Sequence, residues 1–125
     1  MEQGRPKSLL IVDDELALVE FVAELFEDES YTIAMQTDGA AALQLIASDV
    51  SAFDLVITDQ TMPSMLGTEL AQSVRELNAT VPIILCTGFT DDIAEEAFAN
   101  GFVDVLLQKP VRAVEFIEEV ARHLG

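Results

Sequence analysis

The sequence lacks several features that would assign it to other classes of protein. It has one cysteine, Cys86, so no internal disulfide can form, and this residue lies in an apolar run where a small buried side chain is expected. No apolar stretch reaches the ~18 residues that a membrane-spanning helix needs. The short polar start of the chain has none of the regions of a signal peptide. We therefore expect a cytoplasmic protein that makes no membrane contact.

Basic residues are also scarce. The chain has 6 lysines and arginines against 23 aspartates and glutamates, which gives a formal net charge of −17. Because nucleic acids and anionic membranes attract positively charged surfaces, we expect no direct binding of this domain to nucleic acid. Acidity of this degree favours solubility and would attract basic partners, although a solvated acidic surface explains the composition equally well.

The length of 125 residues suits one domain, in which short apolar runs alternate with amphipathic segments. The runs predict strands over residues 8–12, 31–36, 54–58, 82–86 and 103–108. The segments between and after them predict helices over residues 16–26, 39–46, 69–77, 92–99 and 111–124. Asp38 and Thr68 are the expected N-caps of the second and third helices.

Five strand–helix units predict an α/β fold, a doubly wound five-stranded parallel sheet with helices on both faces. We choose the flavodoxin-like strand order 2-1-3-4-5, although the periodicity alone allows another doubly wound order. Residues 8–125 are expected to form this domain, and residues 1–7 a flexible N-terminal segment.

Four of the predicted strands are each followed by charged or hydroxyl side chains. These belong to Asp13, Asp14, Asp59, Thr87 and Lys109. In the chosen order they gather at the carboxyl edge of the sheet, where open α/β sheets bind ligands. Carboxylates a few ångströms apart repel by ~4 kcal/mol per pair at an effective dielectric constant of about 20. One lysine does not balance three carboxylates, so a hard divalent cation, Mg²⁺, is expected among them.

The same residues suit phosphoryl transfer. The Asp59 carboxylate can attack phosphorus to give an aspartyl phosphate, with Lys109 and the Thr87 hydroxyl contacting the phosphoryl oxygens. Gly88, beside Thr87, leaves room for the incoming group. Each residue alone has an ordinary explanation: a helix cap, a loop carboxylate, a strand-end hydroxyl or a surface lysine. Their joint placement after separate strands favours the functional interpretation.

These motifs resemble a response-regulator receiver domain of two-component signalling. The resemblance covers about residues 8–124 and rests on Val12–Glu15, Asp38–Leu43, Asp59–Pro63 with Gly67, Thr87–Gly88 and Lys109–Pro110. It implies a phosphorylation-activated switch rather than a turnover enzyme. The implied donor is a histidine kinase or a histidine phosphotransfer protein, and the downstream target is a protein that the sequence does not name.

The resemblance also implies a role for each matching position. Asp59 is the phosphoacceptor, and Lys109 and Thr87 act on the phosphoryl group. Mg²⁺ is bound directly by Asp14, Asp59 and the backbone carbonyl of Thr61, and through water by Asp13. The expected neighbours of the phosphoryl pocket are Gln60, Gly88 and Phe89, and the Lys109–Pro110 peptide bond is expected to be cis.

Two positions depart from the family's pattern. Leu106 stands where many receivers have Tyr or Phe, three residues before the lysine. It either packs in the core or marks an altered coupling of the site to the surface of the fourth helix and fifth strand. Phe89, two residues after Thr87, is either an exposed loop side chain or a shield against water that slows self-dephosphorylation.

Other functions remain open at this point. A haloacid-dehalogenase-like phosphatase also uses a strand-end aspartate and Mg²⁺, but it generally needs a second Asp where this chain has Thr61, and a cap domain. A binding module that needs no phosphate is the third class. No output domain follows Gly125, so we expect either a stand-alone regulator or a receiver excised from a larger protein. The segment 107–111, without Phe after Pro110, is similar to receivers of hybrid histidine kinases.

Overall fold

The computed structural model describes residues 6–27, 31–77, 79–88 and 92–124. Strands and helices alternate along the chain as predicted. The strands are β1 (Lys7–Val12), β2 (Tyr31–Gln36), β3 (Leu55–Asp59), β4 (Ile83–Thr87) and β5 (Val105–Gln108). The helices are α1 (Leu16–Leu25), α2 (Gly39–Ser48), α3 (Gly67–Glu76), α4 (Asp92–Ala99) and α5 (Ala113–Leu124).

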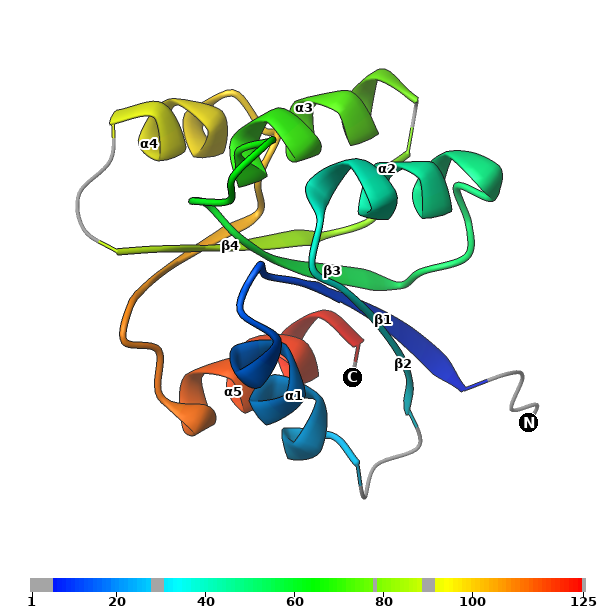
Figure 1. Ribbon diagram of the computed structural model, residues 1–125, viewed down its shortest axis with the longest axis vertical. Helices are drawn as coiled ribbons and strands as arrows, with labels where there is room; N and C mark the ends of the chain where they lie inside the picture. Colours follow the sequence, from blue (N-terminus) through cyan, green and yellow to red (C-terminus); the bar gives the residue numbers. More distant parts are fainter. Residues whose placement is uncertain (1–5, 28–30, 78, 89–91, 125) are drawn as a thin grey trace.

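The strands form one parallel sheet in the order β2-β1-β3-β4-β5, which confirms the predicted topology. Helices α2, α3 and α4 cover one face of the sheet, and α1 and α5 cover the other (Figure 1). The register sets Val12 opposite Thr58 and Thr87 opposite Gln108. The residues that follow these strands therefore meet at one edge of the sheet.

Two apolar layers, one on each face of the sheet, hold the helices in place. Successive strand residues point to opposite faces, so Leu10 packs beneath α2, α3 and α4, whereas Leu9 and Ile11 pack against α1 and α5. Because both faces are covered, the central strands are buried along most of their length and contain continuous runs of apolar residues. This explains why the sequence showed continuous apolar runs in place of alternation.

Some predicted boundaries shift by a few residues. β1 begins at Lys7, within the segment expected to be flexible, because Lys7 pairs with Tyr31 of β2. β3 begins after Asp54, whose carboxylate accepts a hydrogen bond from the Ser8 N–H at 2.8 Å. α5 begins at Ala113 and not at Val111, because the Arg112 N–H donates to Glu115 Oε1 and Arg112 is therefore the flanking residue.

The predicted cap of α3 is wrong. The helix begins at Gly67 with Leu66 as its N-cap, so Thr68 is the second residue of the helix. The prediction followed the local preference for Ser and Thr at N-caps. In the structure a side chain from outside the helix supplies the cap, as described below.

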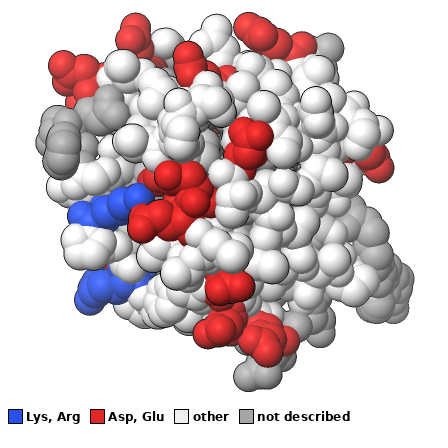
Figure 2. Space-filling view, in the orientation of Figure 1, with Lys and Arg blue, Asp and Glu red and all other residues white. Residues whose placement is uncertain are grey.

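None of the helices within the described ranges is long and apolar enough to cross a bilayer. The face shown in Figure 2 has many acidic side chains, and basic side chains gather beside an acidic group near its centre.

Candidate functional site

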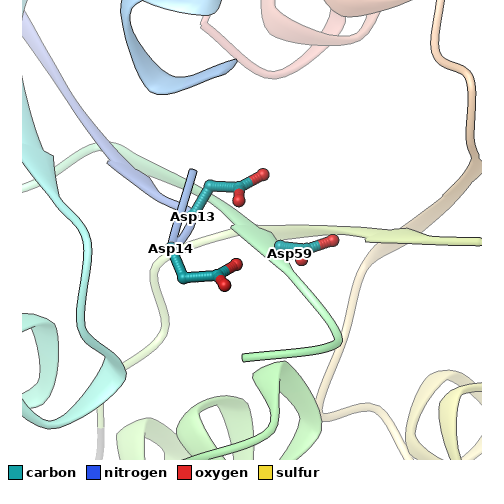
Figure 3. A group of neighbouring side chains, drawn as sticks. All are labelled: Asp13, Asp14 and Asp59. Carbon is teal, nitrogen blue, oxygen red and sulfur yellow. The ribbon is translucent and has the colours of Figure 1, made fainter. Parts of the chain in front are cut away.

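Three carboxylates meet at the carboxyl edge of the sheet. Asp13 and Asp14 follow β1, and Asp59 is the last residue of β3 (Figure 3). One oxygen from each carboxylate lies within 4.8 Å of the others. Asp13 and Asp59 are 9% and 5% exposed, whereas Asp14 faces solvent. The structure thus brings together three acidic residues that the sequence places in two distant segments.

Lys109 joins this group from the residue after β5. Its Nζ lies 2.5 Å from Asp59 Oδ1, and its backbone N–H donates to the Thr87 carbonyl at 2.8 Å. Burial alone would lower the pKa of the Lys109 ammonium, but the hydrogen bond and charge of Asp59, with the charge of Asp13, raise it above its ordinary value. Lys109 therefore stays charged beside Asp59.

The pKa of Asp13 is raised by its position in this group. Burial raises the pKa of its carboxyl from 3.8 to about 6, and the neighbouring Asp59 adds to the rise. A hydrogen bond from the Glu15 N–H to Asp13 Oδ1, at 3.0 Å, acts in the opposite direction. The charge of Lys109 also lowers the pKa of Asp13, but burial outweighs it, so the negative charge of Asp13 is unfavourable in this position without a further cation.

The donor set fits a hard divalent cation. The clustered groups are carboxylate oxygens, one of them on the exposed Asp14, which leaves a path to solvent. Mg²⁺ prefers oxygen ligands and keeps several waters, so a partly open carboxylate cluster suits it. Thr61 lies in the exposed loop after β3, and its carbonyl as a further ligand stays a prediction.

The remaining predicted residues differ in how far the structure describes them. Thr87 ends β4 and is half-buried, and its contact with a phosphoryl group stays a prediction. A Cβ added at Gly88 would meet no atom of the described residues within 4 Å. Phe89 lies outside the described residues. The Lys109–Pro110 peptide bond is cis, the form that the resemblance implies.

Gln60 was expected to border the phosphoryl pocket, but its side chain bonds to α3. Its Oε1 accepts a hydrogen bond from the Thr68 N–H at 2.8 Å, and its Nε2 donates to Thr68 Oγ1 at 3.3 Å. Gln60 is 2% exposed, and a buried amide needs such partners. Two sequence signals pointed this way: a polar residue directly after a buried strand, and Leu66, which has no capping atom, directly before α3.

A cavity beside the site was not predicted. It has a volume of about 390 Å³ and lies between α1 and α5, with Asp13, Asp59 and Lys109 on its lining. Cys86 also lines it, and burial, with the charge of Asp59, raises the pKa of that thiol to about 12. The thiol therefore stays protonated and is no rival nucleophile to Asp59.

Leu106 packs against the apolar layer beneath α2, α3 and α4, and its strand partner is Leu85. This packing agrees with the first of the two interpretations and is compatible with the second. The altered coupling that we predicted from the missing aromatic stays a prediction.

Comparisons with known proteins agree with this geometry. The family model of the response regulator receiver domain matches residues 9–121. The chain is 32% identical over 116 residues to the regulatory protein VanR of Enterococcus faecium, and this alignment covers 93% of this chain and 49% of VanR. It is 29% identical over 106 residues to the transcriptional regulatory protein ZraR of Klebsiella oxytoca, and this alignment covers 84% of this chain and 24% of ZraR.

A solved structure shows the same fold. The CheY-like response regulator receiver domain protein from Methanospirillum hungatei JF-1 superimposes with a TM-score of 0.85 at 26% sequence identity. The superposition covers 94% of this chain and 92% of that protein chain.

The chain spans 24% to 49% of the length of these two relatives. ZraR is a transcriptional regulatory protein, and this argues against our expectation of no direct nucleic-acid binding. That expectation came from the net charge, which describes only the residues of this chain and not a longer protein.

Proposed function

The chain belongs to the response regulator receiver domain family of two-component signalling, and on this premise we propose that it is a phosphorylation-controlled switch whose phosphoacceptor is Asp59. Domains of this family are signalling domains and not classical enzymes. The observation that supports the proposal best is the setting of Asp59, which is buried, paired with Lys109 and clustered with Asp13 and Asp14.

In the proposed reaction a carboxylate oxygen of Asp59 attacks the phosphorus of a phosphohistidine. A P–O bond forms as the P–N bond to the donor's imidazole breaks, and the nitrogen keeps the electron pair. The product is a mixed anhydride, and its lability suits a timed signal. Lys109, already beside Asp59, contacts a phosphoryl oxygen, and the Thr87 hydroxyl donates to another.

Domains of this family bind Mg²⁺ at an acidic pocket. Here Asp14, Asp59 and the Thr61 carbonyl would bind the ion directly, and Asp13 through water. When bound, the ion supplies positive charge that offsets the carboxylates and the phosphoryl oxygens. The clustering of three carboxylates beside Lys109 supports this assignment, because one ammonium does not balance three negative charges.

Response regulators partner with histidine kinases. We propose that the donor for this chain is a histidine kinase or a histidine phosphotransfer protein. Slow loss of the phosphoryl group, attributed to Phe89, is part of the same proposal and rests on the sequence alone. Phe89→Glu is expected to shorten the lifetime of the phosphorylated form, and an unchanged lifetime would remove Phe89 from the account.

Intact-mass spectrometry tests the proposal. Incubation with Mg²⁺ and acetyl phosphate should add one phosphoryl group to the wild-type chain and none to Asp59→Asn. Asp49→Asn is the matched control, because Asp49 is exposed and asparagine keeps its role as acceptor for the Ser51 N–H. The control should be modified as fully as the wild type, and EDTA should abolish modification of both.

Two other outcomes would point to the alternative functions. Continuous turnover of a phosphate ester would indicate a haloacid-dehalogenase-like phosphatase, although Thr61 stands where such an enzyme has an acid/base aspartate. Partner binding that is the same in Asp59→Ala as in the wild type would indicate a binding module that needs no phosphate.

A further inference from the structure

The first turn of α3 lacks a cap of its own. A side-chain oxygen at the N-cap normally accepts a hydrogen bond from one of the first backbone N–H groups of a helix. The N-cap of α3 is Leu66, whose side chain has no acceptor. Glu69 accepts a bond from the Leu66 N–H at 2.8 Å, but this leaves the N–H groups of the first helical residues, Gly67 and Thr68, without a local partner.

Gln60 supplies both missing acceptors from outside the helix. Its backbone carbonyl accepts from the Gly67 N–H at 2.9 Å, and its side-chain Oε1 accepts from the Thr68 N–H at 2.8 Å. Its Nε2 donates to the Thr68 hydroxyl at 3.3 Å. Gln60 and Thr68 are 2% and 6% exposed, so these bonds are shielded from water.

The same residue is fixed to the phosphorylation site. Gln60 directly follows Asp59, and its N–H donates to the Cys86 carbonyl at 2.9 Å, which extends the β3–β4 pairing past Asp59. Gly67 lies so close to Asp59 that an added Cβ would collide with the carbonyl oxygen of Asp59 and with the side chain of Leu85. The start of α3 therefore rests directly on the backbone of Asp59.

Gln60 consequently closes the base of the loop formed by residues 61–66. The loop leaves β3 after Gln60 and returns to Gly67 and Thr68, which Gln60 holds by three hydrogen bonds. The first residue of this loop is Thr61, the proposed carbonyl ligand of Mg²⁺. The backbone carbonyl of Gln60 makes one of these bonds and its side chain makes the other two, so Gln60 joins the two ends of a short loop and restricts where the Thr61 carbonyl can lie.

We propose that Gln60 is a positioning residue that holds the Thr61 carbonyl in place for Mg²⁺ by tying the loop after Asp59 to the first turn of α3. The inference rests on the proposed function, because it assigns a role at the same metal site. The competing explanation is that Gln60 only caps α3 and satisfies its own buried amide. If Gln60 only caps α3, a new local cap would restore Mg²⁺ affinity to a Gln60 variant. If Gln60 positions the Thr61 carbonyl, a local cap would restore stability but not Mg²⁺ affinity.

Mg²⁺ affinity, measured by titration calorimetry, is the main readout. Gln60→Met removes the amide but keeps a side chain of similar length. We expect the dissociation constant for Mg²⁺ to rise about tenfold, the lower end of the loss usual when a residue that orients metal ligands is removed. A dissociation constant within twofold of the wild type would overturn the inference.

Two further variants separate positioning from capping. Thr68→Val is the matched control, because it disturbs the same buried contact but keeps the Thr68 N–H bond to Gln60 Oε1. It should leave the Mg²⁺ dissociation constant within about threefold, and a rise equal to that of Gln60→Met would overturn the inference. Leu66→Ser added to Gln60→Met gives α3 a local cap. We expect it to restore resistance to urea but not Mg²⁺ affinity, and full recovery of affinity would show capping alone.

A measurement on the wild type keeps the inference testable if Gln60→Met does not fold. Because coupling between two sites is reciprocal, Mg²⁺ should slow hydrogen exchange of the Thr68 amide at least twofold. Leu77, at the far end of α3, is the reference amide. Equal effects of Mg²⁺ on the two amides would contradict the inference. A wild type that binds no Mg²⁺ and accepts no phosphoryl group would refute the proposed function itself, and the inference with it.

Discussion

At the scale of single residues, Asp13 has the environment with the clearest consequence. Its pKa is raised from 3.8 to about 6 because the folded chain buries its carboxyl. The folded state thus holds the proton more tightly than the unfolded state does. The free energy of unfolding should therefore fall as the pH rises from about 4 to about 6 and change little above that, as far as this group is concerned.

Asp13→Asn should stabilise the protein at neutral pH in the absence of divalent cations. A shift from 3.8 to about 6 corresponds to about 3 kcal/mol, which is the upper limit of the gain. Asparagine can still accept the hydrogen bond from the Glu15 N–H. Urea unfolding at pH 7 in EDTA measures the effect. Asp38→Asn, an exposed helix cap that asparagine can also provide, is the control and should change little. A destabilised Asp13→Asn would contradict this account of the site.

At the scale of elements, Arg75 ties α3 to the two ends of the segment that contains α4. Its guanidinium bonds at 2.7 to 3.1 Å to the carbonyls of Ala79, Val81 and Phe102 and to the carboxylate of Asp104. Asp104 also accepts a bond from the N–H of Ile83, the first residue of β4. These contacts lie at the amino ends of β4 and β5, at the opposite edge of the sheet from Asp59.

Replacing Arg75 with Met should cost about 2 kcal/mol of unfolding free energy, since several carbonyls lose a charged donor. The ion pair itself contributes little of this, because Asp104 is 42% exposed. Arg112→Met is the control: the Arg112 side chain is 77% exposed, and its loss should cost less than about 0.5 kcal/mol. Urea unfolding gives both values. Labelling by acetyl phosphate should be the same in both variants, and loss of labelling in Arg75→Met would show that the two edges of the sheet are coupled.

Leu106 leads to a prediction about the surface formed by α4 and β5. It packs in the apolar layer and has no ring that could follow a movement of Thr87. Beryllofluoride with Mg²⁺ should therefore cause only small backbone changes on α4 and β5. Crystal structures with and without beryllofluoride provide the measurement, and Leu106→Tyr, which introduces the ring, should enlarge the changes. A large rearrangement of that surface in the wild type would refute the prediction.

The sequence predicted the elements better than their ends. A strand that is covered on both faces needs apolar residues at successive positions, and runs such as Leu9–Val12 show this pattern in the sequence. Because these strands are parallel, the residues that end or follow them were expected at one edge of the sheet, and Asp13, Asp14, Asp59 and Lys109 do lie there. The cap of α3 was missed because it comes from Gln60, and no local rule for Thr68 or Leu66 describes a cap supplied by another element. The cavity between α1 and α5 was missed because it depends on how two helices pack, which periodicity does not specify.

At the scale of the whole molecule, the net charge of −17 makes the fold sensitive to cations in two ways. Any salt screens repulsion between surface carboxylates. A divalent ion bound at the acidic cluster would add a specific effect, because a ligand that binds only the folded state stabilises it.

Mg²⁺ at ten times its dissociation constant should raise the free energy of unfolding by about 1.4 kcal/mol, or the melting temperature by about 5 °C for a domain of this size. NaCl at equal ionic strength is the control for screening and should give a smaller shift. Asp14→Asn, which changes an exposed carboxylate of the cluster, should lose most of the difference between the two salts. Equal shifts with Mg²⁺ and NaCl in the wild type would contradict a specific site.

The most direct test of the central claim is to locate the phosphoryl group on the chain. After treatment with acetyl phosphate and Mg²⁺, borohydride reduction converts an acyl phosphate into a stable alcohol, and peptide mass spectrometry identifies the converted residue. We predict conversion of Asp59 alone, with Asp13, Asp14 and the other carboxylates unchanged. Conversion at a different aspartate, or none at Asp59 in a chain that binds Mg²⁺, would contradict the account.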